Sequence, residues 1–397
     1  MSSAGSATGT TMTGTTASAR TADALVIGAG IVGAAIAYRL AERGLTVRVL
    51  EAADAPASGS TGRSAAGLRV QFTSEINVRL SWQSIQEYRD FETRFGTSSG
   101  YRPQGYLFLV PEDAWPRHAE GVELQRRLGV PVEVLSPSDA RRHVPFATDG
   151  VARATYGPAD GVVDPHAIAT TYLRAARERG ATLHLSTPLR SARRLASSWR
   201  VDTPHGAFEA PNVVNAAGAW AGQVAAAAGL TLPVEPVRRM VFVTGPTPEP
   251  HAYPLTVDVA SGVYLRSEGR RLLIGRSNPD EPAGFHEGVD WSWLEPTLDA
   301  ALPRFPFLET VGLDRRASWW GYYEVTPDHD AILGRHPDTE GWIDAAGFSG
   351  HGVQHAAMVG RLIAEEATQG RARTLDLGPL RHERFAHGAG RRESNIV

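Results

Sequence analysis

Three glycines near the start of the chain have the spacing needed to bind a phosphate group. Gly28, Gly30 and Gly33 form a GxGxxG pattern directly after the short apolar run ADALVIG. In such a pattern the first glycine permits a tight turn, the second lets the backbone approach a pyrophosphate, and the third lets a helix pack closely on a strand. The backbone amides that follow, beginning with Ile31 and Val32, and the helix dipole favour an anion at this position.

A carboxylate completes this pattern. Glu51 ends a second apolar run, TVRVLE, roughly 20 residues after the glycines, as a dinucleotide-binding βαβ unit requires. Its carboxylate is suited to accept hydrogen bonds from both hydroxyls of an adenosine ribose, and it would repel a 2′-phosphate. The pattern therefore predicts a dinucleotide other than NADP. A glycine-rich turn without a ligand is the alternative, and the strand, helix and acid in correct order argue against it.

These groups require a parallel α/β scaffold, which the surrounding sequence predicts. Small and apolar residues recur at helical spacing over 31–43, and Gly44 is suited to end that helix. A second helix is expected over 164–180, before the strand-like ATLHL, and a further strand begins NVVNAAGAWAG. Near the C-terminal end, GWIDAAGFSGHGVQHAAMVGRLIAEEA has the pattern of a strand, a glycine-rich turn and a helix. A second helix N-terminus is then available to the same long ligand.

The segments between these blocks have a different character. Residues 101–110 and 234–243 are typical of strands, 263–275 of a hairpin, and 291–302 of a helix. We therefore expect a second, mostly antiparallel domain interwoven with the first. The predicted boundaries are a nucleotide-binding domain of 22–95, 151–225 and 321–385, a substrate domain of 96–150 and 226–320, and flexible tails of 1–21 and 386–397.

Composition narrows the possible functions. The chain has 397 residues, of which 42% are hydrophobic and 21% charged, with a formal net charge of -3. This composition is typical of a soluble globular protein and disfavours general nucleic-acid binding. No segment has the apolar length of a signal peptide or a membrane span, so we expect a cytoplasmic location. The chain contains no lysine and no cysteine, which excludes Schiff-base chemistry, thiolate ligands and disulfides.

Five segments in order resemble the FAD-dependent D-amino-acid oxidase superfamily, and within it the sarcosine oxidase and proline dehydrogenase branch. They are GAGIVG with Glu51, GSTGRSAAGLRVQF from Gly59, VNAAGAWAG, YYEVTPDHDAILG from Tyr322, and GFSGHGVQ from Gly347. The resemblance covers nearly the whole chain. It implies a Rossmann-like FAD-binding domain of the α/β class interwoven with a substrate domain of mainly antiparallel sheet plus helices.

The resemblance also implies FAD in an extended pose. The ADP half would lie on the first helix N-terminus and Glu51, and the last glycine-rich turn would cover the flavin ring. Amides in that turn could stabilise negative charge that develops on the reduced flavin. FAD is expected to be noncovalent, because cysteine is absent and Ser64 replaces the histidine that carries the flavin in dimethylglycine-type relatives. The other implied contacts are Ser60, Thr61, Arg63, Ala217, Gly218, Gly347, Gly350, His351, Gly352, Val353 and Gln354.

Four residues are implied in substrate binding or catalysis. Arg69 matches the family's arginine for the substrate carboxylate, with pairing to an acid such as Glu75 as the alternative. Gln354 stands where sarcosine oxidases have a second, lysine contact. Tyr323 matches a tyrosine of sarcosine oxidases and the carboxylate-binding arginine of D-amino-acid and glycine oxidases, which argues against the latter two activities. His351 would lie beside the flavin, with either a chemical role or only a backbone partner.

The identity of the electron acceptor depends on one further position. Leu273 stands where sarcosine oxidases have the lysine that activates dioxygen. Without a cation beside the ring the reduced flavin should react slowly with dioxygen, unless Arg276 or protonated His351 supplies the charge. We expect a dehydrogenase or a slow oxidase. Asp328, His329 and Asp330 follow the family's TPDHDAILG run, so a structural turn is expected there and no metal site.

The implied activity is oxidation of a secondary or primary amine in a small amino acid or N-alkyl amino acid. A hydride would pass to flavin N5, and the resulting imine would hydrolyse; the partners would be this amine and dioxygen or another acceptor. The alternatives are a 2-hydroxy acid with His351 as base, a larger secondary metabolite, a flavin-bound accessory subunit, or a nicotinamide-dependent dehydrogenase. Pocket candidates, with core packing as their alternative role, are Phe72, Tyr106, Tyr264 and Trp320.

Overall fold

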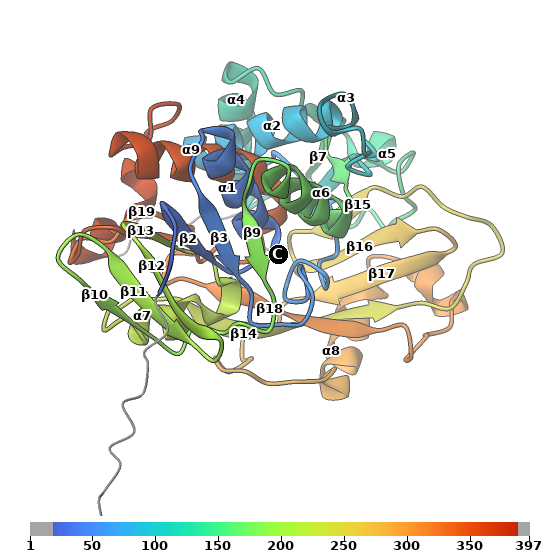
Figure 1. The fold of residues 1–397 in the computed structure, drawn as a ribbon. Coiled ribbons are helices and arrows are strands. Elements are labelled where there is room, and N and C mark those ends of the chain that lie inside the picture. The colour runs from blue at the N-terminus through green and yellow to red at the C-terminus, as the bar shows by residue number, and fades with distance from the viewer. Residues whose placement is uncertain (1–18, 388–397) are drawn as a thin grey trace, which may run out of the picture.

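A six-stranded sheet forms the centre of the nucleotide-binding half of the computed structural model, which describes residues 19–387 (Figure 1). Its strands are parallel except β19, which runs antiparallel to β20. Both sides of a parallel sheet must be covered, which explains why its strands are short apolar runs. The strand order is β19 (Ile332–Arg335), β20 (Trp342–Ala346), β13 (Asn212–Asn215), β2 (Ala24–Ile27), β3 (Val47–Leu50) and β9 (Thr182–His184).

Helices cover one face of this sheet. They are α1 (Ile31–Glu42), α6 (Pro165–Arg177) and α9 (Gly352–Gln369), with α2 (Glu75–Arg89) packed on α9 and followed by α3 (Phe91–Phe95). Eleven of the twelve residues of α1 are buried, because the helix lies between the sheet and its two neighbouring helices. Where α9 crosses α1, a Cβ at Gly360 would lie 2.8 Å from the Ala35 carbonyl carbon, so this contact requires glycine.

A small four-stranded sheet covers the other face. Trp199 and Phe208 from this sheet pack with Leu25 and Trp342 of the central sheet in one apolar cluster. The first of its strands is parallel to its neighbour and the others are antiparallel. The strand order is β1 (Arg20–Thr21), β12 (Gly206–Ala210), β11 (Trp199–Thr203) and β10 (Ser191–Arg194).

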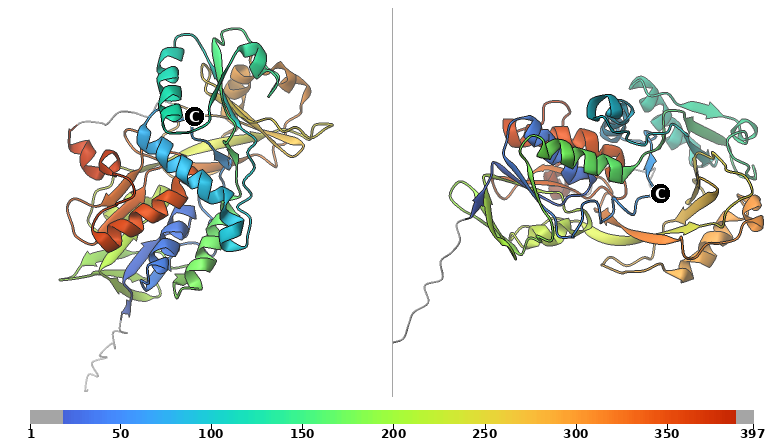
Figure 2. Two further views of the ribbon diagram at one scale, coloured as in Figure 1. Left: turned by 90° about the horizontal axis from the view of Figure 1, so that it is seen from above. Right: turned by 45° about the vertical axis from the view of Figure 1, so that its right-hand side comes forward.

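An eight-stranded sheet forms the second half of the molecule, beside the first in Figure 2. Neighbouring strands are antiparallel except β15 and β5. The order is β18 (Trp319–Val325), β14 (Glu235–Val243), β17 (Arg271–Arg276), β16 (Val263–Glu268), β15 (Leu255–Asp258), β5 (Tyr106–Val110), β7 (Arg153–Gly157) and β6 (Glu133–Leu135).

Short elements complete the fold. A two-stranded sheet joins the halves, three helices flank the large sheet, and one short helix packs beside β13 of the central sheet. These elements are β4 (Gly67–Leu68) with β8 (Gly161–Val162), α4 (Trp115–Arg127), α5 (Pro137–Ala140), α7 (Ala221–Ala226) and α8 (Leu294–Ala301), together with 3-10 turns at Gly218–Trp220, Trp291–Trp293, Pro306–Thr310, Gly378–Leu380 and His382–His387.

The mixed α/β class and the two interwoven halves agree with the expected fold, but two strands lie in the other half. β7 pairs with β5, although 151–225 was assigned to nucleotide binding, and β18 pairs with β14, although its second part falls within 321–385. The predicted tails lie outside the described residues except at their inner ends. There, Arg20–Thr21 form β1, and the last 3-10 turn extends to His387. Within residues 19–387, no helix is long and apolar enough to cross a membrane.

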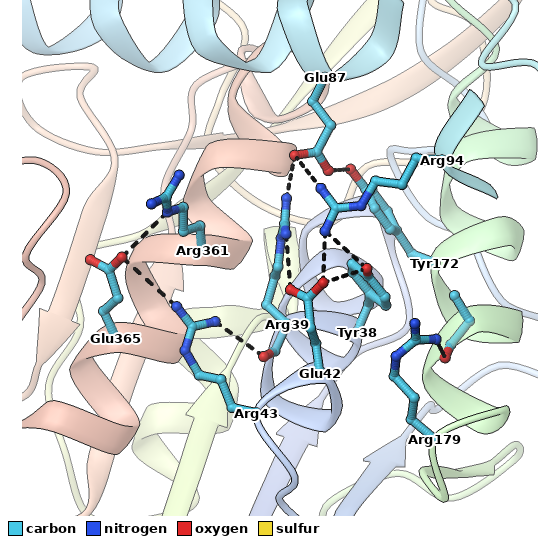
Figure 3. Close-up of polar contacts among 11 residues, drawn as sticks. Tyr38, Arg39, Glu42, Arg43, Glu87, Arg94, Tyr172, Arg179, Arg361 and Glu365 are labelled. Carbon is cyan, nitrogen blue, oxygen red and sulfur yellow. Dashed lines mark hydrogen bonds and ion pairs between the residues drawn. The ribbon is translucent and has the colours of Figure 1, made fainter. Parts of the chain in front are cut away.

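A network of arginines and carboxylates ties the covering helices together (Figure 3). Arg39 of α1 pairs with Glu42 at 3.0 Å and with Glu87 of α2. Arg94 reaches both carboxylates, at 2.7 Å and 3.6 Å, and the Tyr172 hydroxyl donates to Glu87 at 2.6 Å. Burial raises the pKa of Glu42, but hydrogen bonds from neighbouring side chains outweigh burial and bring the pKa to about 2. Glu42 therefore remains ionised across the physiological range.

We predict that Arg39→Met destabilises the protein by about 3 kcal/mol, because it removes the more buried of the two cations that Glu42 and Glu87 share in the helix interface. Arg89→Met is the matched control, since Arg89 pairs with Asp90 where both side chains are more than half exposed. That loss should stay below about 1 kcal/mol. Urea unfolding of the FAD-loaded proteins measures both changes. Equal losses in the two variants would contradict a structural role for the network.

Candidate active site

A cavity of about 510 Å³ runs from the nucleotide-binding half to the large sheet. It begins at the carboxyl ends of β2, β3 and β13. Open α/β sheets bind ligands at this edge, in the crevice where the order of the strands reverses. It ends against β14, β16 and β18. Side chains from both halves therefore face one continuous space.

The first glycine-rich turn has the geometry that its sequence predicts. Gly28 has φ +104°, and a Cβ there would lie 2.5 Å from the Ala216 carbonyl oxygen. Gly30, Ile31 and Val32 line the cavity with Gly28. Gly33 does not, because it packs against the turn: a Cβ there would lie 2.1 Å from the Gly28 carbonyl oxygen. Its contribution to cofactor binding is therefore indirect, through close packing of the helix.

Glu51 connects two loops at the cavity wall. Its Oε2 accepts a hydrogen bond from the Ala29 amide at 2.7 Å, and its Oε1 accepts one from the Ala53 amide at 2.8 Å. The carboxylate also lines the cavity, so its remaining lone pairs are available to a ligand. This position at the end of β3 fits the ribose contact predicted for it.

The segment from Ser58 to Gly67 forms another wall. Ser60, Thr61, Arg63 and Ser64 all line the cavity, as predicted. Thr61 Oγ1 accepts a hydrogen bond from the Ile31 amide at 3.0 Å, and the Ser60 hydroxyl donates to the Tyr322 carbonyl at 2.8 Å. These two bonds fix the segment between the start of α1 and strand β18.

The last glycine-rich turn lies across the cavity from that segment. Gly350, Gly352, Val353 and Gln354 line the space, and Ala217 and Gly218 line it from the end of β13. Gly350 has φ +95°, and a Cβ there would lie 2.5 Å from the Tyr323 ring, so the ring packs directly on the turn. Gly347 does not line the cavity; its amide instead donates to Glu324 Oε2 at 2.9 Å.

The end of the cavity under the large sheet forms a chamber made by Tyr106, Arg239, Tyr264, Tyr323 and Gln354. Arg239 lies 5.4 Å from the centre of the Tyr323 ring. Burial raises the pKa of all three tyrosines, so their phenols remain neutral hydrogen-bond donors and acceptors. The hydroxyls of these three tyrosines form no hydrogen bond with any side chain or backbone group of residues 19–387. The phenols are thus available to a bound molecule.

Arg69 is placed differently from the predicted carboxylate ligand. Its side chain is 1% exposed and is not part of the cavity wall. The guanidinium donates to the Gln71 carbonyl at 2.6 Å and stacks on the Phe72 ring at 4.0 Å. Glu75, the acid named as an example of a partner for Arg69, instead pairs with Arg79 at 2.7 Å. Arg69 supports the wall from behind: its backbone amide donates to Gln354 Oε1 at 3.1 Å.

His351 also lies behind the wall. Its Nε2 is 3.3 Å from Arg69 Nη2, and its ring packs edge-on against Phe72. Burial, with the nearby Arg69 charge, holds the pKa of His351 well below its usual range. The ring is therefore neutral, and it accepts from the guanidinium. His351 is thus absent from the cavity lining, unlike the flavin contact that the resemblance implied, and its neutral ring supplies no cation there.

Of the remaining residues singled out from the sequence, some line the cavity and others lie outside it. Tyr106 and Tyr264 line the cavity, whereas Phe72 is fully buried and Trp320 stacks with Arg63 at 4.1 Å. Asp328 is bound by Arg384 at 2.7 Å in a structural turn. In the part of the chain that the structure describes, no three His, Asp or Glu side chains gather as metal ligands.

Two charged residues of the cavity wall were not singled out from the sequence. Glu324 lies on β18, where its Oε2 accepts a hydrogen bond from the Gly347 amide, and Arg239 lies on β14. Arg239 shares a strand face with Val237 and Val241, so a charge on an otherwise apolar face was the available signal. Glu324 had no comparable signal, because its partner is a backbone amide distant in sequence.

Known proteins share this architecture. The chain is 32% identical to FAD-dependent oxidoreductase domain-containing protein 1 of Xenopus laevis, over 91% of this chain and 82% of that protein. It is 29% identical to the mitochondrial sarcosine dehydrogenase of Mus musculus, over 84% of this chain but only 38% of the longer enzyme. A solved structure, L-proline dehydrogenase from P. horikoshii, superposes with a TM-score of 0.87 at 31% identity and covers 94% of this chain and 100% of its own.

Glu324 gives the protein a specific pH dependence. Burial raises its pKa to about 7, although backbone amides favour the charged form. Between its unfolded value of 4.5 and about pH 7 the folded state holds a proton that the unfolded state has released. This group's contribution therefore lowers stability as pH rises through that window. We predict that Glu324→Gln removes this decline while still accepting from Gly347. Urea unfolding at several pH values compares the slopes, and identical slopes would contradict the assignment.

We predict that Glu51→Ala weakens FAD binding by about 30-fold or more, because a charged acceptor contributes about 2 kcal/mol and a tenfold change is about 1.4 kcal/mol. Glu51→Gln, which keeps an acceptor oxygen, should lose less. Flavin fluorescence released on dilution gives both dissociation constants. Full flavin absorbance in purified Glu51→Ala would show that the ribose contact is unimportant.

The described residues fit FAD, because the glycine-rich turn, the start of α1 and Glu51 line one cavity together with the small residues Ala217, Gly218, Gly350 and Gly352. The family model described as FAD dependent oxidoreductase matches residues 23–366. The chain therefore belongs to the FAD-dependent oxidoreductases of the D-amino-acid oxidase superfamily, in the sarcosine oxidase and proline dehydrogenase branch, and FAD is its cofactor.

Proposed function

We propose that the protein oxidises the secondary or primary amine of a small amino acid or N-alkyl amino acid. The observation that carries this proposal is the chamber, which adjoins the FAD-binding walls and presents neutral phenols, one guanidinium and one amide. Such a set of groups suits a compact molecule with an anionic end and an amine. The relatives add support, since one is named a sarcosine dehydrogenase and one an L-proline dehydrogenase.

The residues of the chamber would act by orientation and desolvation. Bound FAD supplies an acceptor for a hydride at its N5 atom. An amine that gave up a hydride from the carbon attached to nitrogen would form a C=N bond with its nitrogen lone pair, and water would then hydrolyse the imine. A neutral amine needs no strong base for this step. The aromatic walls would fix the reacting carbon in one orientation. This lowers the activation free energy, because the entropy cost of alignment is met when the substrate binds.

Oxidation of a 2-hydroxy acid is less well supported. That reaction requires a base to take the hydroxyl proton. His351 was the candidate, but it lies behind the wall and its Nε2 faces Arg69. Glu324 lines the cavity, yet its Oε2 accepts from the Gly347 amide. An amine therefore fits these residues better than an alcohol.

We further propose that the electron acceptor is not dioxygen in the main reaction. Leu273 is 2% exposed and packs with Val241 and Val243, so the oxidase lysine position holds an apolar side chain. Arg276 is engaged elsewhere, donating to the Ser261 and Pro296 carbonyls at 2.9 Å and 3.1 Å. Neither residue lines the cavity, so neither supplies a cation there. A quinone or partner protein is the expected acceptor class.

The test is anaerobic bleaching of the flavin followed by admission of air. The panel contains sarcosine, L- and D-proline, N-methyl and primary amino acids, 2-hydroxy acids and larger amines. We expect an amino acid to bleach the flavin and air to restore its colour over minutes. Bleaching only by 2-hydroxy acids, or only by larger amines, would overturn the substrate proposal. Recovery within seconds would identify an oxidase instead of a dehydrogenase.

A further inference from the structure

Two adjacent arginines on β14 have opposite environments. Successive side chains of a strand point to opposite faces of its sheet. Arg238 lies on the outer face, where its Nε is 2.8 Å from Glu281 and its Nη2 is 3.6 Å from Asp290. Arg239 lies on the inner face and lines the cavity. The strand therefore places one arginine in an ion-paired network on the outer face of the sheet and the next in the chamber.

Arg239 has no counter-ion among the described residues. Its Nη1 donates to the Arg238 carbonyl at 3.0 Å, and its Nε is buried without a hydrogen-bond partner. The Tyr323 ring at 5.4 Å compensates only part of the cost of removing a guanidinium from water. Burial lowers the pKa of Arg239, yet arginine stays protonated in proteins. The chamber thus contains a permanent positive charge that a ligand can neutralise.

The surrounding groups determine which ligand suits this charge. Gln354 is neutral, and its oxygen already accepts from the Arg69 amide. Tyr264 and Tyr323 add hydroxyl groups that can donate to an anion beside the guanidinium. A planar guanidinium with free N–H groups matches the two oxygens of a carboxylate. The rings of Tyr106, Tyr264 and Tyr323 line the same space.

We propose that Arg239 binds the carboxylate of the substrate, in the role that the sequence assigned to Arg69. This inference rests on the proposed function and narrows it: the substrate is an amino acid with a free carboxylate, and a plain amine is a poor substrate. Arg69 then acts as a positioning residue, which fixes Gln354 and the Phe72 wall from behind. Arg239 thereby determines specificity between amino acids and amines of equal size.

The first test measures binding without turnover. Acetate is titrated into the FAD-loaded protein, and the flavin difference spectrum and melting temperature are followed, with acetamide as the neutral isostere. We expect saturable binding of acetate and little response to acetamide. Arg239→Gln should weaken acetate binding by 30-fold or more, and Arg239→Lys by less, while FAD content stays complete. Arg238→Gln, on the same strand but the outer face, should retain acetate binding.

The second test compares substrates of matched shape. L-proline and pyrrolidine differ by the carboxylate alone, and so do sarcosine and dimethylamine. In a pair whose acid is a substrate, we expect the acid to bleach the wild-type flavin with a second-order rate constant at least 100-fold higher than that of the amine. Arg239→Gln should reduce this preference mainly by raising KM for the acid. The preference of Arg238→Gln should equal that of wild type.

Several outcomes would overturn the inference. These are unchanged acetate binding in Arg239→Gln, no saturable acetate response in wild type, loss of FAD from the variant, or equal bleaching by the acid and the amine. The last would leave amine oxidation intact and remove only the carboxylate role. Conversely, Arg239-dependent acetate binding in a protein that no amine bleaches would contradict the proposed function and retain the carboxylate site.

Discussion

The rest of the site depends on the two hydrogen bonds that the Glu51 carboxylate accepts from backbone amides. One carboxylate accepts the Ala29 amide after β2 and the Ala53 amide after β3. It therefore fixes the two loops that follow adjacent parallel strands, and with them the start of α1. Thr61 then binds the Ile31 amide of the same helix. The wall that continues toward the large sheet is built outward from this point.

Two strands of the large sheet place polar side chains at the far end of the cavity. β14 and β18 pair in antiparallel register, with Arg239 opposite Gly321 and Val237 opposite Tyr323. A Cβ at Gly321 would lie 3.2 Å from the Arg63 Cβ, so this glycine lets the loop that carries Arg63 approach β18 closely. Tyr323 packs on the Gly350 turn, and Glu324 binds the Gly347 amide. The sheet and the last turn of the FAD-binding half are thus joined by neighbouring residues of one strand.

Local patterns predicted the FAD-binding half well. The GxGxxG turn, Glu51, the Ser60 to Ser64 segment and the last glycine-rich turn depend on short-range geometry, and most of these residues line the cavity. Matching to a family locates a residue along the chain but not the direction of its side chain. This explains why Arg69, at its expected position, lies behind the wall. Strand partners distant in sequence, such as β7 with β5, leave no local signal at all.

The permanent charge of Arg239 has a consequence for the form of substrate that the chamber accepts. An amino acid in water is a zwitterion, with a protonated amine whose lone pair is unavailable. Binding that form would leave a net positive charge beside neutral phenols, whereas binding the anion with a free amine makes the chamber neutral. Poor solvation penalises net charge. The same guanidinium that orients the carboxylate would therefore lower the pKa of the bound amine and select the protonation state that can release a hydride.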